Sequence, residues 1–133
     1  MYKVLLVDDE YMVTEGLKRL IPFDKWGMEV VATASHADEA LEYVQENSVD
    51  VVISDVNMPE KTGLDMIREM KEILPDAAYI LLSGYQEFDY VKKAMNLSVV
   101  DYLVKPVDKV ELGNLLEKIA GQLGERGKKS QTL

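Results

Sequence analysis

Five short apolar runs alternate with longer amphipathic segments along this chain, and no other feature limits its fold as much. Each run is rich in Val, Ile and Leu with little polar alternation, as is typical of strands covered on both faces. Connections of this length predict a parallel sheet between two layers of helices, with right-handed crossovers. The runs occupy residues 3–7, 29–34, 49–54, 77–82 and 99–104.

The segments after the runs carry apolar residues at helical spacing, so a helix is predicted after each run. Ser35 or Asp38 is the expected N-cap of the second helix, and Trp26 is expected to fill the loop after the first. The predicted buried stripes are Met12, Leu17, Leu20 and Ile21; Ala37, Ala40, Leu41 and Val44; Leu64, Ile67, Met70 and Leu74; Phe88, Val91, Ala94 and Met95; and Val110, Leu112, Leu115, Leu116 and Ile119.

The number of runs and the length of the chain together predict a single α/β domain. Five strands in roughly 120 residues fit a flavodoxin-like, three-layer (βα)5 fold with strand order 2-1-3-4-5, whereas a closed barrel of this kind needs eight strands. The segment GERGKKSQTL at the end is polar and lacks periodicity. We therefore predict a domain over residues 1–122 and a linker or disordered tail over residues 123–133.

Charge and cysteine content exclude several functional classes. The chain has 24 acidic and 15 basic residues, a net charge of −9, so it is not expected to grip nucleic acid by itself. It has no cysteine, which excludes disulfides, thiolate metal ligands and cysteine nucleophiles. No apolar run approaches the roughly 20 residues of a membrane span, so we expect a cytoplasmic protein without membrane contact.

Polar residues follow four of the five runs, at the point where each predicted strand ends. The first run ends at Asp8 and Asp9, the third at Asp55, the fourth at Ser83 and the fifth at Lys105. Ligands of open parallel sheets bind beyond the carboxyl ends of the strands, where the strand order reverses. Strands one and three are neighbours in the predicted order, so the three aspartates are expected to converge.

This set of residues indicates phosphoryl chemistry. Carboxylates crowded in one cleft repel one another, so the expected outcome is a raised pKa or a bound cation, and hard oxygen ligands without histidine or cysteine suit Mg²⁺. Lys105 adds a positive charge at the same edge, and Ser83 adds a hydroxyl donor. With no cysteine and one histidine, a carboxylate is the expected covalent acceptor, and Asp55 is the best candidate because the Asp8–Asp9 pair is placed to hold metal.

Four motifs carry a resemblance to a known family. They are VDDE near the start, SDVNMPEKTG after the third run, LLSGY after the fourth and DYLVKP across the fifth. Together they resemble the receiver domain of bacterial two-component response regulators over about residues 2–122. The resemblance implies a domain that accepts a phosphoryl group from the phosphohistidine of a sensor histidine kinase. It also implies that the domain is not an enzyme, with at most slow autodephosphorylation.

The resemblance also assigns roles at the acidic edge. It implies that Asp55 is the phosphoacceptor and that Asp9 binds Mg²⁺ directly. Asp8 matches the metal's second acid, which acts partly through water, and Asn57 matches the position whose backbone carbonyl binds the metal. Thr62 is a departure, because the family often has an acidic residue before the loop glycine.

Residues near the fourth and fifth strands match the family's switch. The resemblance implies that Ser83 contacts the phosphoryl group on activation and that Lys105 is the lysine of the pocket. Tyr102 matches an aromatic residue whose rotamer follows the state of that hydroxyl. The bond between Lys105 and Pro106 is expected to be cis.

The segments IPFDKWG and SGYQEFDYVKKAM resemble the receivers that are fused to helix-turn-helix domains of the arabinose-regulator type. Such a protein would control transcription and contact DNA only through a domain absent from this chain. A homodimer through the fourth helix, fifth strand and fifth helix is a further expectation. A stand-alone single-domain regulator, a Mg²⁺-dependent phosphatase-like enzyme and a phosphorylation-independent interaction module are the alternatives.

Overall fold

The computed structural model describes residues 1–84 and 100–131. Its centre is a five-stranded parallel sheet in the order β2-β1-β3-β4-β5, which confirms the predicted flavodoxin-like fold. Each strand lies within two residues of a predicted run. The strands are β1 (Tyr2–Val7), β2 (Met28–Ala34), β3 (Val51–Asp55), β4 (Ala78–Ser83) and β5 (Val100–Val104).

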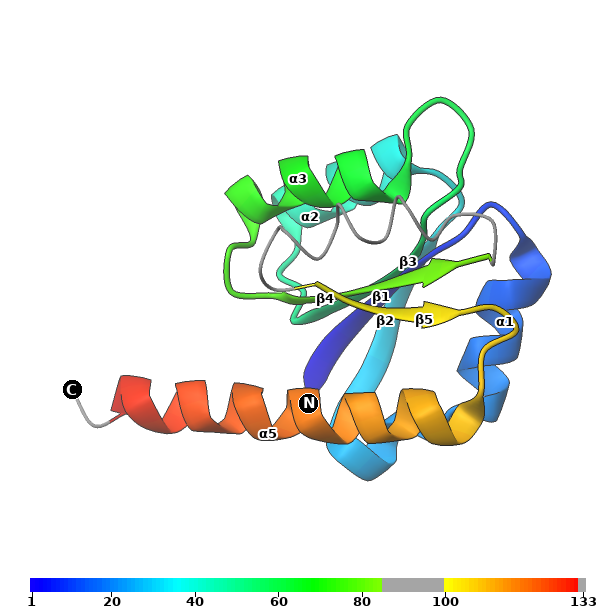
Figure 1. The fold of residues 1–133 in the computed structure, drawn as a ribbon. Coiled ribbons are helices and arrows are strands. Elements are labelled where there is room, and N and C mark those ends of the chain that lie inside the picture. The colour runs from blue at the N-terminus through cyan, green and yellow to red at the C-terminus, as the bar shows by residue number, and fades with distance from the viewer. Residues whose placement is uncertain (85–99, 132–133) are drawn as a thin grey trace.

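Helices cover both faces of the sheet, so the molecule has three layers (Figure 1). α2 and α3 pack on one face, and α1 and α5 pack on the other. Alternate residues of the strands point into the two cores, as a sheet buried on both faces requires: Leu5 and Val7 enter one, and Val4 and Leu6 the other. The helices are α1 (Tyr11–Leu20), a 3₁₀ turn η1 (Phe23–Trp26), α2 (Ala37–Glu46), α3 (Gly63–Ile73) and α5 (Lys109–Gln131).

The parallel register brings the ends of the strands to one edge. Val7 lies opposite Ser54 in β3, so Asp8 and Asp55 follow directly at the same level. On the other side of β3, Asp55 lies opposite Leu82 in β4, and Ser83 lies opposite Val104 in β5. The polar residues that follow the apolar runs therefore share one end of the sheet.

The start of α2 differs from the prediction. His36 is the N-cap, and its Nδ1 accepts a hydrogen bond from the Glu39 backbone N–H at 3.2 Å. Ser35 and Asp38 do not cap the helix. The Ser35 hydroxyl donates to the Glu39 carboxylate, and Asp38 lies within the first turn. His36 fills the role because its backbone is extended, as an N-cap requires, and its ring nitrogen can accept.

The predicted apolar stripe of α1 is only half buried. Leu17 and Ile21 are in the core, whereas Met12 is 79% exposed and Leu20 is 56% exposed. At roughly 100° per residue, Met12 lies about 140° around the helix from Leu17, and Leu20 lies at the edge of the buried face. The prediction was therefore wrong for Met12 and Leu20.

α5 continues to Gln131, so residues 123–131 are helical rather than the irregular tail expected there. In its first turn Val110 is 72% exposed, although Leu112, Leu116 and Ile119 are buried as predicted. The fourth predicted stripe lies outside the described residues. No helix in the described part of the chain, α5 included, has the length and apolar character needed to cross a bilayer.

Candidate functional site

Three aspartates meet at the carboxyl edge of the sheet. One carboxylate oxygen from each of Asp8, Asp9 and Asp55 lies within 4.8 Å of the others. Asp8 and Asp55 are buried, whereas Asp9 is exposed. The Asp8 N–H donates to the Ala34 carbonyl at 3.0 Å, which holds the chain in sheet geometry beyond β1. The predicted convergence of the three aspartates is therefore present in the structure.

Lys105 joins the two buried carboxylates. Its Nζ lies 3.3 Å from Asp8 Oδ2 and 3.2 Å from Asp55 Oδ1, and its side chain is 25% exposed. Its backbone N–H donates to the Ser83 carbonyl at 2.7 Å, which extends the β4–β5 pairing by one residue. The Lys105–Pro106 peptide bond is cis, as expected. The fold therefore holds the ammonium group between two carboxylates.

Burial dominates the protonation behaviour of the cluster. Desolvation raises the pKa of Asp55, and the neighbouring Asp8 charge raises it further. The pKa of Asp8 is also raised, mainly by burial, against hydrogen bonding from the Glu10 N–H and the charge of Lys105. Burial opposes the charge of Lys105, but Asp55 and Asp8 outweigh it and its pKa is raised. The positive charge of one lysine therefore does not neutralise the negative charge of the aspartate cluster.

The donor set suits a hard divalent cation. Three carboxylates against one ammonium group leave excess negative charge, which a cation such as Mg²⁺ would neutralise. All three aspartates offer oxygen ligands, and the exposed Asp9 keeps one side open to water. Mg²⁺ usually retains several waters and is bound by few carboxylates, so this half-open acidic edge fits it.

The loop after Asp55 supports the site through its backbone. Asn57 is exposed, and a hydrogen bond from its backbone lowers the pKa of Asp55. Glu60 has a positive φ of 69°, which only a few non-glycine residues adopt. Thr62 ends the loop as the N-cap of α3, and its hydroxyl accepts from the Asp65 N–H at 3.2 Å. The departure at Thr62 therefore has a structural role, because a hydroxyl caps a helix as a carboxylate does.

Gly63 supports the site in a way that the sequence prediction missed. A Cβ at this position would lie 2.1 Å from the Asp55 carbonyl oxygen, closer than two such atoms can approach. The Gly63 N–H also donates to the Val56 carbonyl at 2.8 Å. The Ser54 hydroxyl donates to the same Asp55 carbonyl at 2.9 Å. The signal in the sequence was a glycine just after a capping threonine at a helix start.

The two switch residues are placed differently. Ser83 is buried at the end of β4 and contacts Lys105 through the backbone hydrogen bond described above. Tyr102 is half-buried and packs against the core on the α2–α3 face. The structure therefore brings Asp8, Asp9, Asp55 and Lys105 into one cluster, with Ser83 adjoining it and Tyr102 on the neighbouring core.

Comparison with known proteins identifies the family. Residues 4–117 match the response regulator receiver domain. The REC domain of AraT, a response regulator from Geobacillus stearothermophilus, is 38% identical and superposes with a TM-score of 0.89. That match covers 95% of this chain and 98% of the AraT domain. A two component transcriptional regulator AraC from Clostridium phytofermentans is 25% identical with a TM-score of 0.87, covering 94% and 97% of the two chains.

Curated relatives are longer. The transcriptional regulatory protein HptR of Staphylococcus aureus is 36% identical over 132 residues, which are 96% of this chain and 52% of HptR. An uncharacterized response regulatory protein of Staphylococcus epidermidis is 37% identical over 126 residues, 95% of this chain and 49% of that protein. The chain therefore spans about half the length of these relatives. It belongs to the response regulator receiver domain family, the signalling domains of two-component systems.

Proposed function

We propose that this receiver domain accepts a phosphoryl group on Asp55 from a sensor histidine kinase. The observation that carries the proposal is the pair of short contacts from Lys105 to Asp8 and Asp55 within an otherwise acidic cluster. A lysine held there is placed to pair with the charge that a phosphoryl group brings. The rest of the cluster is placed to hold Mg²⁺.

The metal ligands in this proposal are Asp8, Asp9, Asp55 and the backbone carbonyl of Asn57. Receiver domains bind Mg²⁺ at an acidic pocket of this kind. When bound, Mg²⁺ would neutralise the carboxylates and stabilise negative charge on phosphoryl oxygens. Asp9 is the exposed member of the set and gives the site its opening to solvent.

The transfer forms one bond and breaks another. A carboxylate oxygen of Asp55 attacks the phosphorus atom, and the phosphorus–nitrogen bond of the donor phosphohistidine breaks. The imidazole ring takes the bonding electrons and leaves as neutral histidine, because its other ring nitrogen carries a proton. Asp55 must be ionised to attack, and Lys105 favours the ionised form, since its charge lowers the pKa of Asp55. Transfer to water would later hydrolyse the acyl phosphate and reset the domain.

The new phosphoryl group would bias a two-state equilibrium. Its oxygens accept hydrogen bonds, so the Ser83 hydroxyl and the Lys105 ammonium group would both turn towards it. Tyr102 lies three residues before Lys105 on β5 and packs beside the core, where a change at the end of β4 would reach it. In this proposal Tyr102 reports the state of the site on another surface.

The output is proposed to be transcriptional. Relatives about twice as long are named as transcriptional regulators, and one structural relative is an AraC regulator. We propose that the receiver, residues 1–122, is joined through residues 123–133 to an arabinose-regulator-type helix-turn-helix domain that binds DNA. A homodimer through the segment after β4, β5 and α5 would bring two such domains together.

Incubation with acetyl phosphate and Mg²⁺ tests the acceptor. Intact-mass measurement should show one phosphoryl adduct on the wild-type chain and none on Asp55→Asn. Asp50→Asn is a matched control, because Asp50 lies before β3 at the opposite end of the strand and should leave the adduct unchanged. An adduct of equal yield on Asp55→Asn would refute the assignment. Rapid multiple turnover of a generic phosphate ester would instead indicate a phosphatase.

A further inference from the structure

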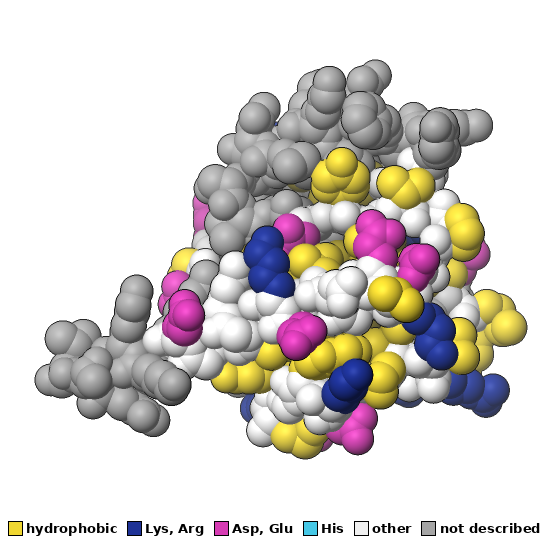
Figure 2. Space-filling view, turned by 60° about the horizontal axis from the view of Figure 1, so that its bottom comes forward, with side chains coloured by type: hydrophobic (Ala, Val, Ile, Leu, Met, Phe, Trp, Pro, Cys, Tyr) yellow, Lys and Arg dark blue, Asp and Glu magenta, His cyan; other side chains and the backbone are white. Residues whose placement is uncertain are grey.

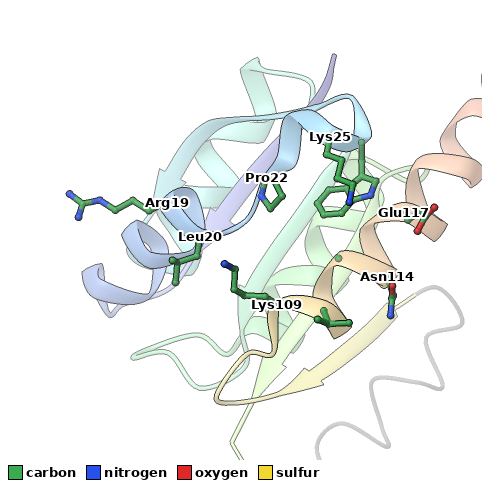
Figure 3. Close-up of a pocket in the computed structure, with 10 residues that line it drawn as sticks. Arg19, Leu20, Pro22, Lys25, Lys109, Asn114 and Glu117 are labelled. Atoms are coloured by element: carbon green, nitrogen blue, oxygen red, sulfur yellow. The ribbon is translucent and has the colours of Figure 1, made fainter.

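A hollow of about 490 Å³ lies on the α1–α5 face, between the end of α1, the η1 turn and the first turns of α5 (Figure 3). It is separate from the aspartate cluster, and the proposed phosphotransfer does not use it. Figure 2 brings this side of the molecule forward and shows apolar side chains gathered there, with basic and acidic side chains among them. We call it the Trp26 pocket, and its main lining residues are Arg19, Leu20, Lys25, Trp26, Lys109 and Val110.

The Trp26 pocket has apolar side chains in its walls that are open to water. Leu20 is 56% exposed and Val110 is 72% exposed, although both were predicted to lie in the core. Trp26 is half-buried, and its ring lies against Gly113 of α5, where an added Cβ would be 3.3 Å from the ring carbons. The pocket therefore exposes two aliphatic side chains beside an aromatic ring, a combination suited to an apolar anchor.

Three cations, Arg19, Lys25 and Lys109, line the Trp26 pocket, and none of them has an acidic partner among the described residues. Within the described part of the chain, no carboxylate lies within 4.0 Å of a nitrogen of Arg19, Lys25 or Lys109, although acidic residues outnumber basic ones 24 to 15. By contrast, Lys61 pairs with two carboxylates on the same molecule. Three cations that have no carboxylate partner among the described residues thus lie where apolar surface is exposed.

The side chains differ in how they face the pocket. Lys109 extends across the space between α5 and α1 towards Leu20, whereas Arg19 points outward from the rim (Figure 3). Lys25 lies over the Trp26 ring, with Nζ 5.7 Å from the ring centre. Two cations therefore flank the apolar walls, and the third stands where an extended ligand would leave the pocket.

We propose that the Trp26 pocket docks an acidic polypeptide segment of a partner protein. An aliphatic or aromatic side chain of that segment would pack between Leu20, Trp26 and Val110. Carboxylates on either side of this anchor would pair with Lys25 and Lys109, and one further along the segment would reach Arg19. Burial of the anchor supplies affinity, and the charge pairs supply selectivity.

A polypeptide fits these features better than a nucleic acid strand. Glu117 lines the α5 side of the pocket and would repel a closely spaced row of phosphates, as would the net charge of −9. A peptide can place a neutral or apolar residue opposite Glu117 and keep its carboxylates for the cations. The apolar side chains of the pocket would also make no favourable contact with a charged phosphate backbone.

The chain has one tryptophan, so its fluorescence reports this pocket alone. The probe is a capped heptapeptide with a central leucine flanked by glutamates. Matched peptides replace the leucine with serine, or the glutamates with glutamines or lysines. We expect a saturable change in Trp26 emission with the leucine–glutamate peptide only, weakened by added salt. Equal responses to the serine or lysine peptides, or no saturable response at millimolar peptide, would overturn the proposal.

Variants test whether the cations of the pocket contribute to peptide binding. The double variant Lys25→Gln with Lys109→Gln should bind the leucine–glutamate peptide about tenfold more weakly, as expected for loss of two partly exposed charge pairs. Lys118→Gln is the control, because Lys118 is an exposed lysine of the same helix that pairs with Asp101 instead. Unchanged affinity in the double variant, or a tighter response to a single-stranded oligonucleotide than to the peptide, would contradict an acidic peptide site.

Discussion

The aspartate cluster and the Trp26 pocket use positive charge in opposite ways. Lys105 is held by two buried carboxylates at the edge of the sheet, and the fold fixes its position before any ligand binds. Lys25 and Lys109 stand at the surface of the Trp26 pocket with no carboxylate partner among the described residues. The first region is preorganised, as the proposed phosphoryl transfer would require. The second can adapt its long side chains to a larger ligand.

The largest expected effect tests how rigid the two regions are. Gly63→Ala would place a Cβ against the Asp55 backbone, so we expect it to lower the free energy of unfolding by about 3 kcal/mol. Gly113→Ala would meet only the Trp26 ring, which can shift at the surface, and should change the free energy of unfolding by less than about 1 kcal/mol. Urea denaturation measures both values.

Gly121→Ala is the reference for these two variants. It lies within α5 with nothing within 4 Å of the added Cβ, so it should stabilise the protein by about 0.5–1 kcal/mol through helix propensity. If Gly63→Ala and Gly113→Ala lower the free energy of unfolding by the same amount relative to Gly121→Ala, the aspartate cluster and the Trp26 pocket would not differ in rigidity.

Mg²⁺ should stabilise the protein through the aspartate cluster alone. At a free Mg²⁺ concentration 100 times its dissociation constant, the free energy of unfolding should rise by about 2.7 kcal/mol. Asp9→Asn removes an exposed member of the cluster and should abolish most of this gain. Lys109→Gln should leave it intact. Thermal unfolding with and without Mg²⁺ gives the comparison, and an undiminished gain in Asp9→Asn would exclude that residue from the site.

Removing a lysine should cost stability in one region and not in the other. Lys105→Met leaves two buried carboxylates without their cation, so the Mg²⁺-free protein should lose about 2 kcal/mol at neutral pH. Lys109→Gln removes an exposed charge that has no carboxylate partner among the described residues, so it should change stability by no more than about 0.5 kcal/mol. A similar loss for both variants in chemical denaturation would show that Lys109 has a structural contact.

The smallest expected effect concerns pH. The pKa of Asp55 is raised above its ordinary value of 3.8, so the folded state binds its proton more tightly than the unfolded state does. The stability of the Mg²⁺-free protein should therefore fall as the pH rises from 3.8 through the raised pKa. Asp55→Asn should remove part of this slope and raise stability at neutral pH by roughly 1 kcal/mol. A steeper fall of stability with pH in Asp55→Asn than in the wild type would contradict the predicted sign of the Asp55 contribution.

Periodicity predicted the sheet well because the three central strands, β1, β3 and β4, are largely buried on both faces. Runs such as residues 49–54 show little polar alternation, and polar residues mark their ends at the carboxyl edge of the sheet. That is why Asp8, Asp55 and Lys105 could be brought together from spacing and strand order. The same reasoning placed Ser83 at the end of β4.

Other features depended on details that periodicity does not carry. Met12 and Leu20 are apolar but lie off the buried face of α1, which only the helix phase against the sheet decides. The cap at His36 depends on a ring nitrogen that residue preferences do not favour. The role of Gly63 arises from a backbone approach between α3 and the end of β3, and the glycine after the capping threonine does not by itself reveal which backbone atoms it approaches.

The most direct test of the central claim locates the acyl phosphate by chemistry. After incubation with acetyl phosphate and Mg²⁺, borohydride reduction converts a phosphorylated aspartate into homoserine, and peptide mass spectrometry finds its position. We predict homoserine at residue 55, in a yield that depends on Mg²⁺ and falls sharply in Asp9→Asn. Homoserine at Asp8 or Asp9 instead, or equal labelling at exposed aspartates such as Asp38, would contradict the account.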